Sequence, residues 1–239
     1  MKSKNTLFLI PARKGSKGLP KKNIKKLGGK ILIDYSVEFA KSAYKSQIDD
    51  IAITTNDIEI TNIYNKDPEI NIINRPDEIA SDSSGMVEVI LHSISYMASK
   101  QIFYDKILLL QPTSPYRLLS DYFKIENMMN SGSEVVLSSN LTKANPYFNL
   151  YEETKDGYIK KCIVSNFKTR QECPKIFELN GMYFYFKTKN FNKYGLHHNP
   201  KTKTLIIDNN RAIDIDTIED FNKAELYLKN FNEENNTKT

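Results

Sequence analysis

The chain has 239 residues, of which 40% are hydrophobic and 26% are charged, and its formal net charge is +5. This length suits one domain with a sizeable core, and the composition is that of an ordinary globular protein. Two cysteines exclude a disulfide framework and a cysteine-rich zinc module, and the longest aliphatic run, at 107–110, is too short to cross a bilayer. We therefore expect a cytoplasmic protein.

Short runs of β-prone residues alternate with helical patterns through the first two-thirds of the chain. The predicted strands are 7–11, 51–55, 70–74, 106–111 and 134–139, and the predicted helices lie near 31–46, 57–66, 84–100 and 119–131. Strands separated by helices of this length indicate right-handed βαβ units, and therefore a parallel sheet covered on both faces. We expect an α/β fold with a doubly wound, mostly parallel sheet, whose ligands bind at the carboxyl ends of the strands.

The alternation of strands and helices breaks down near residue 140. Residues 140–180 contain turn signals and short β-prone stretches, which favour an inserted β-rich flap. Further strands are predicted at 181–186, 204–207 and 212–215, followed by a helix at 217–231 with Thr217 as its N-cap. The prediction is a single domain over 1–231, interrupted by the flap, with a frayed polar tail at 232–239.

The loop after the first strand, PARKGSKGLPKKN at 11–23, carries five cationic side chains, two glycines and no carboxylate. Glycines permit turned backbone N–H groups that bind anions, and Arg13, Lys17 and Lys22 could contact phosphate oxygens. The loop matches neither a kinase-type P-loop nor a dinucleotide fingerprint. It favours a small polyphosphate over nucleic acid, because no aromatic residues interleave with its cations. A plain strand-to-helix connection is the alternative.

Asp214 and Asp216 alternate along the end of the predicted strand at 212–215, so both side chains are expected on one face. Two neighbouring carboxylates repel each other unless a cation or a proton lies between them, and a hard divalent ion such as Mg²⁺ would satisfy the pair. The alternative is a strand end and helix cap with solvated acids.

Gln111 and the residues up to Pro115 follow an aliphatic strand, so their polar groups should lie at the carboxyl edge of the sheet. An amide and two hydroxyls there suit the hydroxyls and carboxylate of a sugar, and the alternative is an ordinary loop punctuated by prolines. Arg75 could hold a triphosphate or be a surface arginine, and Arg170 on its own is typical of a surface cation.

Several short motifs occur in a fixed order along the chain. They are 10–23, Arg75-Pro76-x-Glu78-x-Ala80-x-Asp82, Leu109 to Pro115, Arg170-Gln171, Asn180-Gly181 and Ile213 to Thr217. This ordered set spans roughly residues 6–225 and resembles the sugar-activating cytidylyltransferases. That family includes the acylneuraminate (CMP-sialic acid) synthetases and their legionaminic and pseudaminic acid relatives. Each motif alone is weakly specific, whereas the ordered set is highly specific.

The resemblance implies a nucleotide-diphospho-sugar transferase-like fold and CTP-dependent transfer of CMP to a nonulosonic acid, with release of pyrophosphate. It also implies Mg²⁺ at Asp214 and Asp216, catalytic roles for Lys22, Arg170 and Asp216, and a homodimer whose flap reaches the partner's site. The implied CTP-binding residues are Pro11, Ala12, Arg13, Lys17, Lys22, Asn23, Arg75 and Ser84. The implied sugar-binding residues are Gln111, Thr113, Ser114, Arg170 and Asn180.

The identity of the sugar depends on positions where related enzymes differ. Bacterial sialic acid-type enzymes tend to carry an arginine where this chain has Glu178 and a lysine where it has Phe148, so we favour the legionaminic acid branch. The alternatives are a CMP-Kdo synthetase, a sugar nucleotidyltransferase that uses UTP or GTP, and a non-catalytic nucleotide-binding module. The carboxylate pair argues against the last of these.

Overall fold

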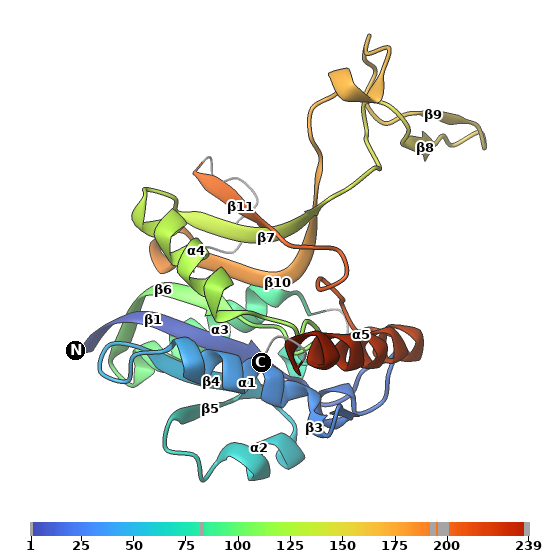
Figure 1. Ribbon diagram of the computed structural model, residues 1–239. Coiled ribbons are helices and arrows are strands. Elements are labelled where there is room, and N and C mark those ends of the chain that lie inside the picture. The colour runs from blue at the N-terminus through green and yellow to red at the C-terminus, as the bar shows by residue number, and fades with distance from the viewer. Residues whose placement is uncertain (1, 82–83, 192–194, 196–200, 237–239) are drawn as a thin grey trace.

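The computed structural model describes residues 2–81, 84–191, 195 and 201–236. Its centre is a seven-stranded sheet in the order β11-β7-β10-β6-β1-β4-β5 (Figure 1). The strands are β1 (Lys2–Pro11), β4 (Asp50–Thr55), β5 (Ile70–Asn74), β6 (Ile102–Leu109), β7 (Val135–Leu141), β10 (Phe177–Lys187) and β11 (Thr202–Ile206). Neighbouring strands are parallel except around β10, which runs antiparallel to both β6 and β7. The expected mostly parallel α/β sheet is confirmed.

Helices cover both faces of this sheet and close its carboxyl edge. The α-helices of the described residues are α1 (Leu32–Ala43), α2 (Ile58–Tyr64), α3 (Met86–Ser99), α4 (Leu119–Asn130) and α5 (Ile218–Asn236). Short 3₁₀ turns are η1 (Lys22–Ile24), η2 (Asp77–Ile79), η3 (Arg170–Glu172) and η4 (Thr188–Asn190). The buried residues of α1 and α4 pack on one face of the sheet and those of α3 pack on the other. None of the described helices combines the length and apolarity that crossing a membrane requires.

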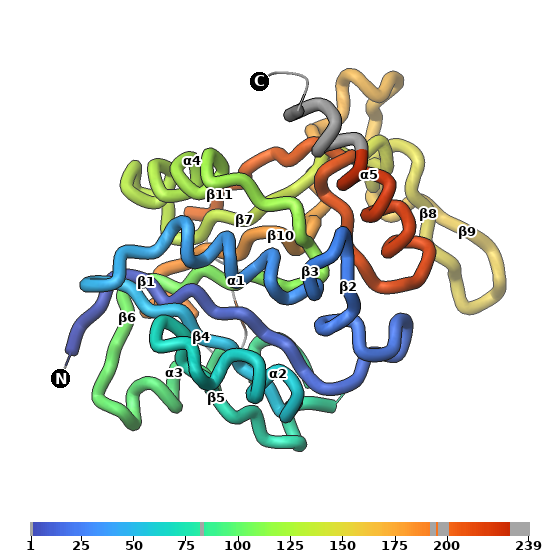
Figure 2. Tube along the Cα trace, turned by 60° about the horizontal axis from the view of Figure 1, so that its bottom comes forward, coloured from blue at the N-terminus to red at the C-terminus, as the bar shows by residue number. Residues whose placement is uncertain are grey.

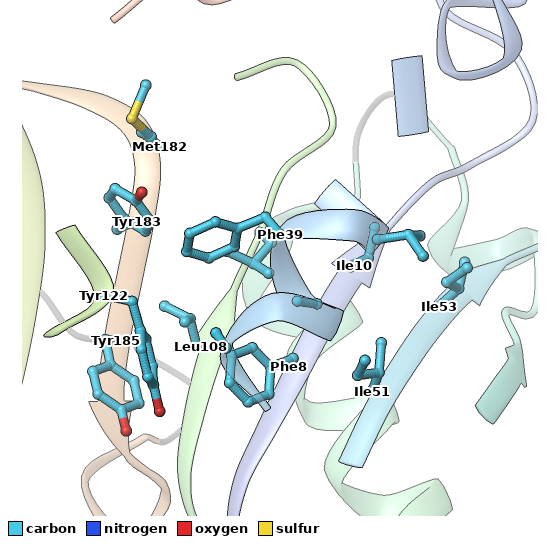
Figure 3. Packing of buried hydrophobic residues seen from close by; sticks show 14 of the residues in the cluster. Phe8, Ile10, Phe39, Ile51, Ile53, Leu108, Tyr122, Met182, Tyr183 and Tyr185 are labelled. Atoms are coloured by element: carbon cyan, nitrogen blue, oxygen red, sulfur yellow. The ribbon is translucent and has the colours of Figure 1, made fainter. Parts of the chain in front are cut away.

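The alternation of side chains along β1 supplies both halves of the core. Phe8 and Ile10 point towards α1 and α4, and Figure 3 shows them beside buried residues of β4, in one cluster with aromatic rings of α1, α4 and β10. Leu7 and Leu9 point to the opposite face, towards α3. Each of these side chains is fully buried, which contributes about 1.5–3 kcal/mol apiece. The core therefore fixes where β1 ends and where the loop after it begins.

Side-chain caps determine where two of the helices begin. The Asp57 carboxylate accepts a hydrogen bond of 2.9 Å from the Glu59 N–H at the start of α2. At α5 the Thr217 hydroxyl accepts from the Asp220 N–H at 3.2 Å, and the Asp220 carboxylate accepts from the Thr217 N–H at 3.0 Å. The predicted N-cap is confirmed. Helix α5 continues to Asn236, beyond the predicted end at residue 231, and residues 237–239 of the predicted tail lie outside the described residues.

The predicted strand at 212–215 is wrong, because this segment joins no β-ladder. Its backbone instead makes one long-range bond, from the Ile215 N–H to the Thr113 carbonyl at 2.9 Å. Ile213 and Ile215 pack into a cluster beneath α5, which lies beside the short β2 (Lys26–Leu27) and β3 (Lys30–Ile31) pair (Figure 2). The alternation of apolar and acidic residues thus reflects packing of an extended segment and not pairing within a sheet.

Residues 142–176 leave the sheet between β7 and β10 and form a projecting arm (Figure 1). The arm carries an antiparallel pair, β8 (Tyr151–Glu153) with β9 (Ile159–Lys161), and the turn η3. At its base, Leu141 of β7 is the register partner of Phe177 of β10. The arm is therefore an insertion between two strands that are already neighbours in the sheet.

Candidate active site

A cleft of about 390 Å³ opens at the carboxyl ends of β1, β5 and β6, where open α/β sheets bind their ligands. Its walls come from the loop after β1, the residue after β5, the loop after β6 and the segment before α5. Of the residues predicted from the sequence, it brings together Pro11, Arg13, Lys17, Lys22, Asn23, Arg75, Gln111, Thr113 and Asp216.

The loop after β1 is held to the sheet by backbone bonds. The Ala12 N–H donates to the Thr54 carbonyl at 3.0 Å, which extends the β1–β4 ladder by one step. Asn23 donates through Nδ2 to the Arg13 carbonyl at 3.2 Å and so ties the two ends of the loop together. Gly15 has a φ of +81°, a left-handed conformation that favours glycine. These bonds curl the loop around the cleft, with Arg13, Lys17 and Lys22 on the wall.

Gly18 is where the loop meets the segment before α5. A Cβ atom on Gly18 would lie 2.3 Å from the Asp216 carbonyl oxygen, which is closer than any real contact of this kind. Only glycine therefore permits the two backbones to approach this closely. The contact fixes the distance between the basic loop and the acidic segment.

Lys22 and Asp216 form the ion pair that bridges these two segments. Lys22 Nζ lies 2.8 Å from Asp216 Oδ1; the lysine side chain is 9% exposed and the aspartate side chain 70%. Water screens a carboxylate that is this exposed, so the pair adds little to stability and can exchange one partner for a ligand at modest cost. The loop itself has no acid, and the counter-charge of Lys22 comes from the far end of the chain.

Arg75 places a buried positive charge on the cleft wall. Its guanidinium donates to Thr54, to the carbonyl oxygen at 2.8 Å and to Oγ1 at 3.4 Å, and no carboxylate among the described residues pairs with it. Burial, together with the charge of Arg13, lowers the pKa of Arg75 to about 10, so the group still carries its charge at neutral pH. A cation without a counter-ion at the wall of a cleft attracts an anionic ligand.

Two residues predicted to bind the nucleotide do not line the cleft. Ala12 is fully buried in the core, so only its backbone lies near the site. The Ser84 hydroxyl donates to the Glu78 carbonyl at 3.0 Å, and its oxygen lies 2.7 Å from Ser81 Oγ. These bonds keep Ser84 within its own loop, two residues before Met86, which does line the cleft.

The loop after β6 supplies polar groups at the centre of the site. Gln111 donates through Nε2 to the Gly181 carbonyl at 3.3 Å, which joins this loop to β10. The Thr113 hydroxyl favours the charged form of the Asp214 carboxyl and so lowers its pKa. Ser114 was predicted alongside them, but it is 1% exposed and its Oγ has no hydrogen-bond partner in the described structure. Of the predicted trio, Gln111 and Thr113 face the cleft and Ser114 is turned away from it.

A second cavity of about 680 Å³ lies on the other side of this loop, between the end of β7, the start of β10 and residues 209–214. Asn180 and Asp214 are on its wall, whereas Asp216 is on the wall of the first cleft. The two carboxylates therefore stand at the boundary between the two cavities. This arrangement can hold two reactants side by side, with the acids between them.

Electrostatics at this boundary fit a hard divalent cation. Partial burial and the nearby charge of Asp216 raise the pKa of Asp214, against the opposing effects of the Thr113 hydroxyl and Lys22. The described residues contain no group of three or more histidine, cysteine or acidic side chains placed to bind a metal. A pair of carboxylates without further protein ligands is the donor set that Mg²⁺ uses when water and substrate phosphates complete its shell.

Arg170 does not reach either cavity of its own chain. It lies on η3 in the projecting arm, exposed to solvent, with its guanidinium carbon 5.8 Å from the centre of the Phe148 ring. The structure of a single chain therefore separates Arg170 from Lys22 and Asp216, with which the sequence had grouped it.

Arg117 is a buried residue behind the site that the sequence analysis did not select. Its guanidinium donates to the carbonyl of Met182 at 2.9 Å, to the carbonyl of Gln111 at 2.8 Å and to Ser36 Oγ at 3.0 Å. Burial lowers the pKa of Arg117 to about 10. It holds the loop after β6 against β10, and its signal in the sequence is an arginine two residues after a motif of prolines and hydroxyls.

Comparisons with known proteins identify the family and the fold of this chain. A family model described as Cytidylyltransferase matches residues 7–235. The chain is 30% identical to the post-translational flagellin modification protein B of Campylobacter coli, over 95% of this chain and 96% of that protein. It is 26% identical to the CMP-N,N'-diacetyllegionaminic acid synthase of Legionella pneumophila, over 93% and 96%. A solved CMP:2-keto-3-deoxy-manno-octonic acid synthetase in complex with CTP has the same fold, with a TM-score of 0.65, 14% identity and coverage of 95% and 99%.

Proposed function

The chain belongs to the cytidylyltransferase family, and we propose that it makes a CMP-sugar from CTP and a nonulosonic acid, with release of pyrophosphate. The observation that carries this proposal is the pair of adjoining cavities with Asp214 and Asp216 at their boundary. One cavity has cationic walls suited to a triphosphate, and the other has amide-rich walls suited to a sugar.

The first cleft is the proposed CTP site. Arg13, Lys17, Lys22 and Arg75 line it and would contact phosphate oxygens through charge-assisted hydrogen bonds. Lys22 would exchange its bond to Asp216 for a phosphate oxygen, because the exposed aspartate holds it only weakly. These cations act on the charge that develops on the departing pyrophosphate.

Asp214 and Asp216 are the proposed Mg²⁺ ligands, on the strength of their donor chemistry and of the coupling between them. When bound, the ion would neutralise phosphate oxygens and lower the pKa of a hydroxyl that it contacts. The protein's part in the reaction is positioning and charge neutralisation.

The reaction itself requires no covalent enzyme intermediate. The anomeric hydroxyl of the acceptor, held in the second cavity, attacks the α-phosphorus of CTP in the first. An oxygen–phosphorus bond forms, the bond between the α-phosphorus and its bridging oxygen breaks, pyrophosphate departs, and the hydroxyl proton is lost to solvent. Gln111 lines the first cleft and is bonded to Gly181, next to Asn180 on the wall of the second cavity, so we propose that it contacts the acceptor where the two cavities adjoin.

The arm suggests a homodimer. In one chain it exposes large apolar side chains, with Val164 at 88%, Tyr158 at 76% and Ile159 at 69%. Apolar groups gathered on a projecting segment favour burial against a partner, and a second copy of this chain is the partner we propose. Arg170 would then act in the cleft of the other copy, which explains why it reaches neither cavity of its own. We propose the cytoplasm, where CTP is available, as the compartment.

The direct test is pyrophosphate release by the purified protein with Mg²⁺ and CTP against sialic, legionaminic, pseudaminic and Kdo acids. We expect release with at least one nonulosonic acid, and loss of about 10³-fold or more in kcat for Asp216→Asn in a folded protein. Release with none of the four acceptors, or substantial kcat in Asp216→Asn, would contradict the proposal. Replacing CTP by UTP or GTP tests the choice of nucleotide.

A further inference from the structure

Three asparagines form a hydrogen-bonded chain along the wall of the second cavity. Asn180 of β10 donates through Nδ2 to Asn140 Oδ1 at 2.8 Å. Asn140, on β7, donates in turn through Nδ2 to Asn209 Oδ1 at 2.6 Å. All three residues line the cavity, and Asn140 and Asn209 belong to none of the motifs that identify the site.

The backbone fixes the orientation of every amide in this chain. The Met182 N–H, which can only donate, bonds to Asn180 Oδ1 at 3.2 Å. The Ile207 carbonyl, which can only accept, takes a bond of 3.0 Å from Asn140 Nδ2. Turning any one amide by half a rotation would set donor against donor or acceptor against acceptor. The hydrogen bonds therefore run in one direction only, donated from Asn180 to Asn140 and from Asn140 to Asn209.

This direction of hydrogen bonding leaves one unused donor, on Asn209. Both N–H groups of Asn140 are used, one by Asn209 Oδ1 and one by the Ile207 carbonyl. Asn209 Oδ1 accepts the bond from Asn140. Asn209 Nδ2 has no hydrogen-bond partner among the described residues, and the residue is exposed on the cavity wall. Asn209 Nδ2 is therefore a hydrogen-bond donor on the cavity wall, and the bond between Asn209 Oδ1 and Asn140 fixes its orientation.

Glu178 offers the complementary acceptor on the same cavity. It is the register partner of Asn140, so the two side chains lie on the same face of the sheet. No cation of the described residues forms an ion pair with Glu178. The wall also carries Lys143 and Asp214, so its charges are mixed, but the Glu178 carboxylate lies on the same wall as the donor of Asn209 and disfavours an anionic group beside that donor. The wall therefore suits a neutral group that both accepts and donates a hydrogen bond.

We infer that Asn209 and Glu178 are specificity-determining residues that bind an acylamido substituent of the acceptor sugar, an inference that rests on the proposed function. The carbonyl of a secondary amide accepts from Asn209 Nδ2, and its N–H donates to the Glu178 carboxylate. A site built to bond such a group discriminates against an acceptor that lacks it, because the site's polar groups are then left without their partner.

The test uses Asn209→Asp, which keeps the shape of the side chain but replaces its donor by an acceptor. Pyrophosphate release is measured with CTP and either N,N'-diacetyllegionaminic acid or Kdo, which carries hydroxyls and no acylamido group. We expect Asn209→Asp to raise KM for the diacetylated acceptor about tenfold or more, while KM for CTP and the parameters for Kdo change less than about twofold. Glu178→Gln, which keeps an acceptor oxygen and removes the charge, is expected to have a smaller effect in the same direction.

Asn210→Asp is the matched control, because it adds the same charge one residue away, on an exposed side chain outside the cavity. Equal shifts in Asn209→Asp and Asn210→Asp would overturn the inference, as would a wild-type protein that releases pyrophosphate faster with Kdo than with the diacetylated sugar. Those results would leave the cytidylyltransferase reaction intact.

If no acceptor supports release, the proposed function fails. In that case NMR titration decides the inference, by comparing the binding of the diacetylated sugar to wild type and to Asn209→Asp. Equal binding, or none, overturns it.

Discussion

Gly18→Ala perturbs the contact that sets the spacing between the basic loop and the acidic segment. The new Cβ atom would lie 2.3 Å from the Asp216 carbonyl oxygen, whereas ordinary contacts begin at 3.4 Å. The obstacle is backbone and not the flexible end of a side chain, so it cannot rotate away. One of the two segments has to move by about 1 Å, which is the difference between those distances.

A displacement of about 1 Å between groups that act on the same phosphate costs about 10²-fold in rate, or about 2.7 kcal/mol in the activation free energy. The loop is at the surface and can shift without exposing the core, so the thermal unfolding midpoint should change little. We therefore expect a folded protein whose kcat/KM for pyrophosphate release falls about 10²-fold.

Gly85→Ala is the matched control for this experiment. Gly85 also has a φ in the ordinary negative range, and a Cβ atom there meets nothing within 4 Å. Its kcat/KM should stay within about twofold of wild type. If folded Gly18→Ala keeps wild-type kcat/KM, the spacing of the two segments does not control the reaction and the reasoning is refuted.

Three further changes test the caps, the surface charges and the arm. Thr217→Ala removes the cap of α5 and should cost about 1 kcal/mol, or about 2–4 °C in Tm by calorimetry; an unchanged Tm would contradict the capping role. Lys41, at 2.6 Å from Asp67, holds the pKa of that carboxyl below its ordinary 3.8. The stabilisation of the fold by this ion pair is therefore complete above pH 3.8 and is lost as the pH falls through the lowered pKa of Asp67. In urea titrations, the free energy of unfolding of Lys41→Met should be lower than that of wild type at pH 6, and the two values should converge near pH 2. A gap that persists at pH 2 would refute this assignment. Val164→Glu should weaken the proposed dimer in sedimentation equilibrium without changing the fold, whereas Leu226→Glu, an equally simple change on exposed α5, should not; equal dissociation in both variants would count against the arm as the interface.

The strands of the parallel half of the sheet were predictable because each is a short aliphatic run bounded by turn residues. The position of β10 was not. Its aromatic stretch at 181–186 indicates a strand, but nothing local shows that it lies antiparallel between β6 and β7. That placement depends on pairings with residues far away in the sequence, which local propensity does not encode.

The error at 212–215 has a specific physical origin. Ile213 and Ile215 alternate with acids as in a half-buried strand, and a buried cluster beneath α5 selects the same pattern without any ladder. The period of two reports only which side of an extended segment is buried. It was sufficient to predict that Asp214 and Asp216 face away from the core, but not that they would line two different cavities.

The basic loop and Asp216 were predictable as parts of one site, the loop from its charge and the aspartate from the resemblance of ordered motifs. Arg117 and the asparagine chain were not. Asparagine and arginine are common at surfaces, and what distinguishes Arg117, Asn140 and Asn209 is a set of hydrogen bonds between distant strands and loops. Such bonds become visible only when the fold has brought the segments together.

The register match at the base of the arm makes the arm a module that can be exchanged. Because Leu141 and Phe177 already face each other across β7 and β10, a short hairpin turn could join them and leave the ladder between the two strands unbroken. Insertions and replacements between these residues are therefore tolerated by the sheet whatever their length. The arm can therefore change in sequence and length while the strands that position the cleft after β1 keep their pairing.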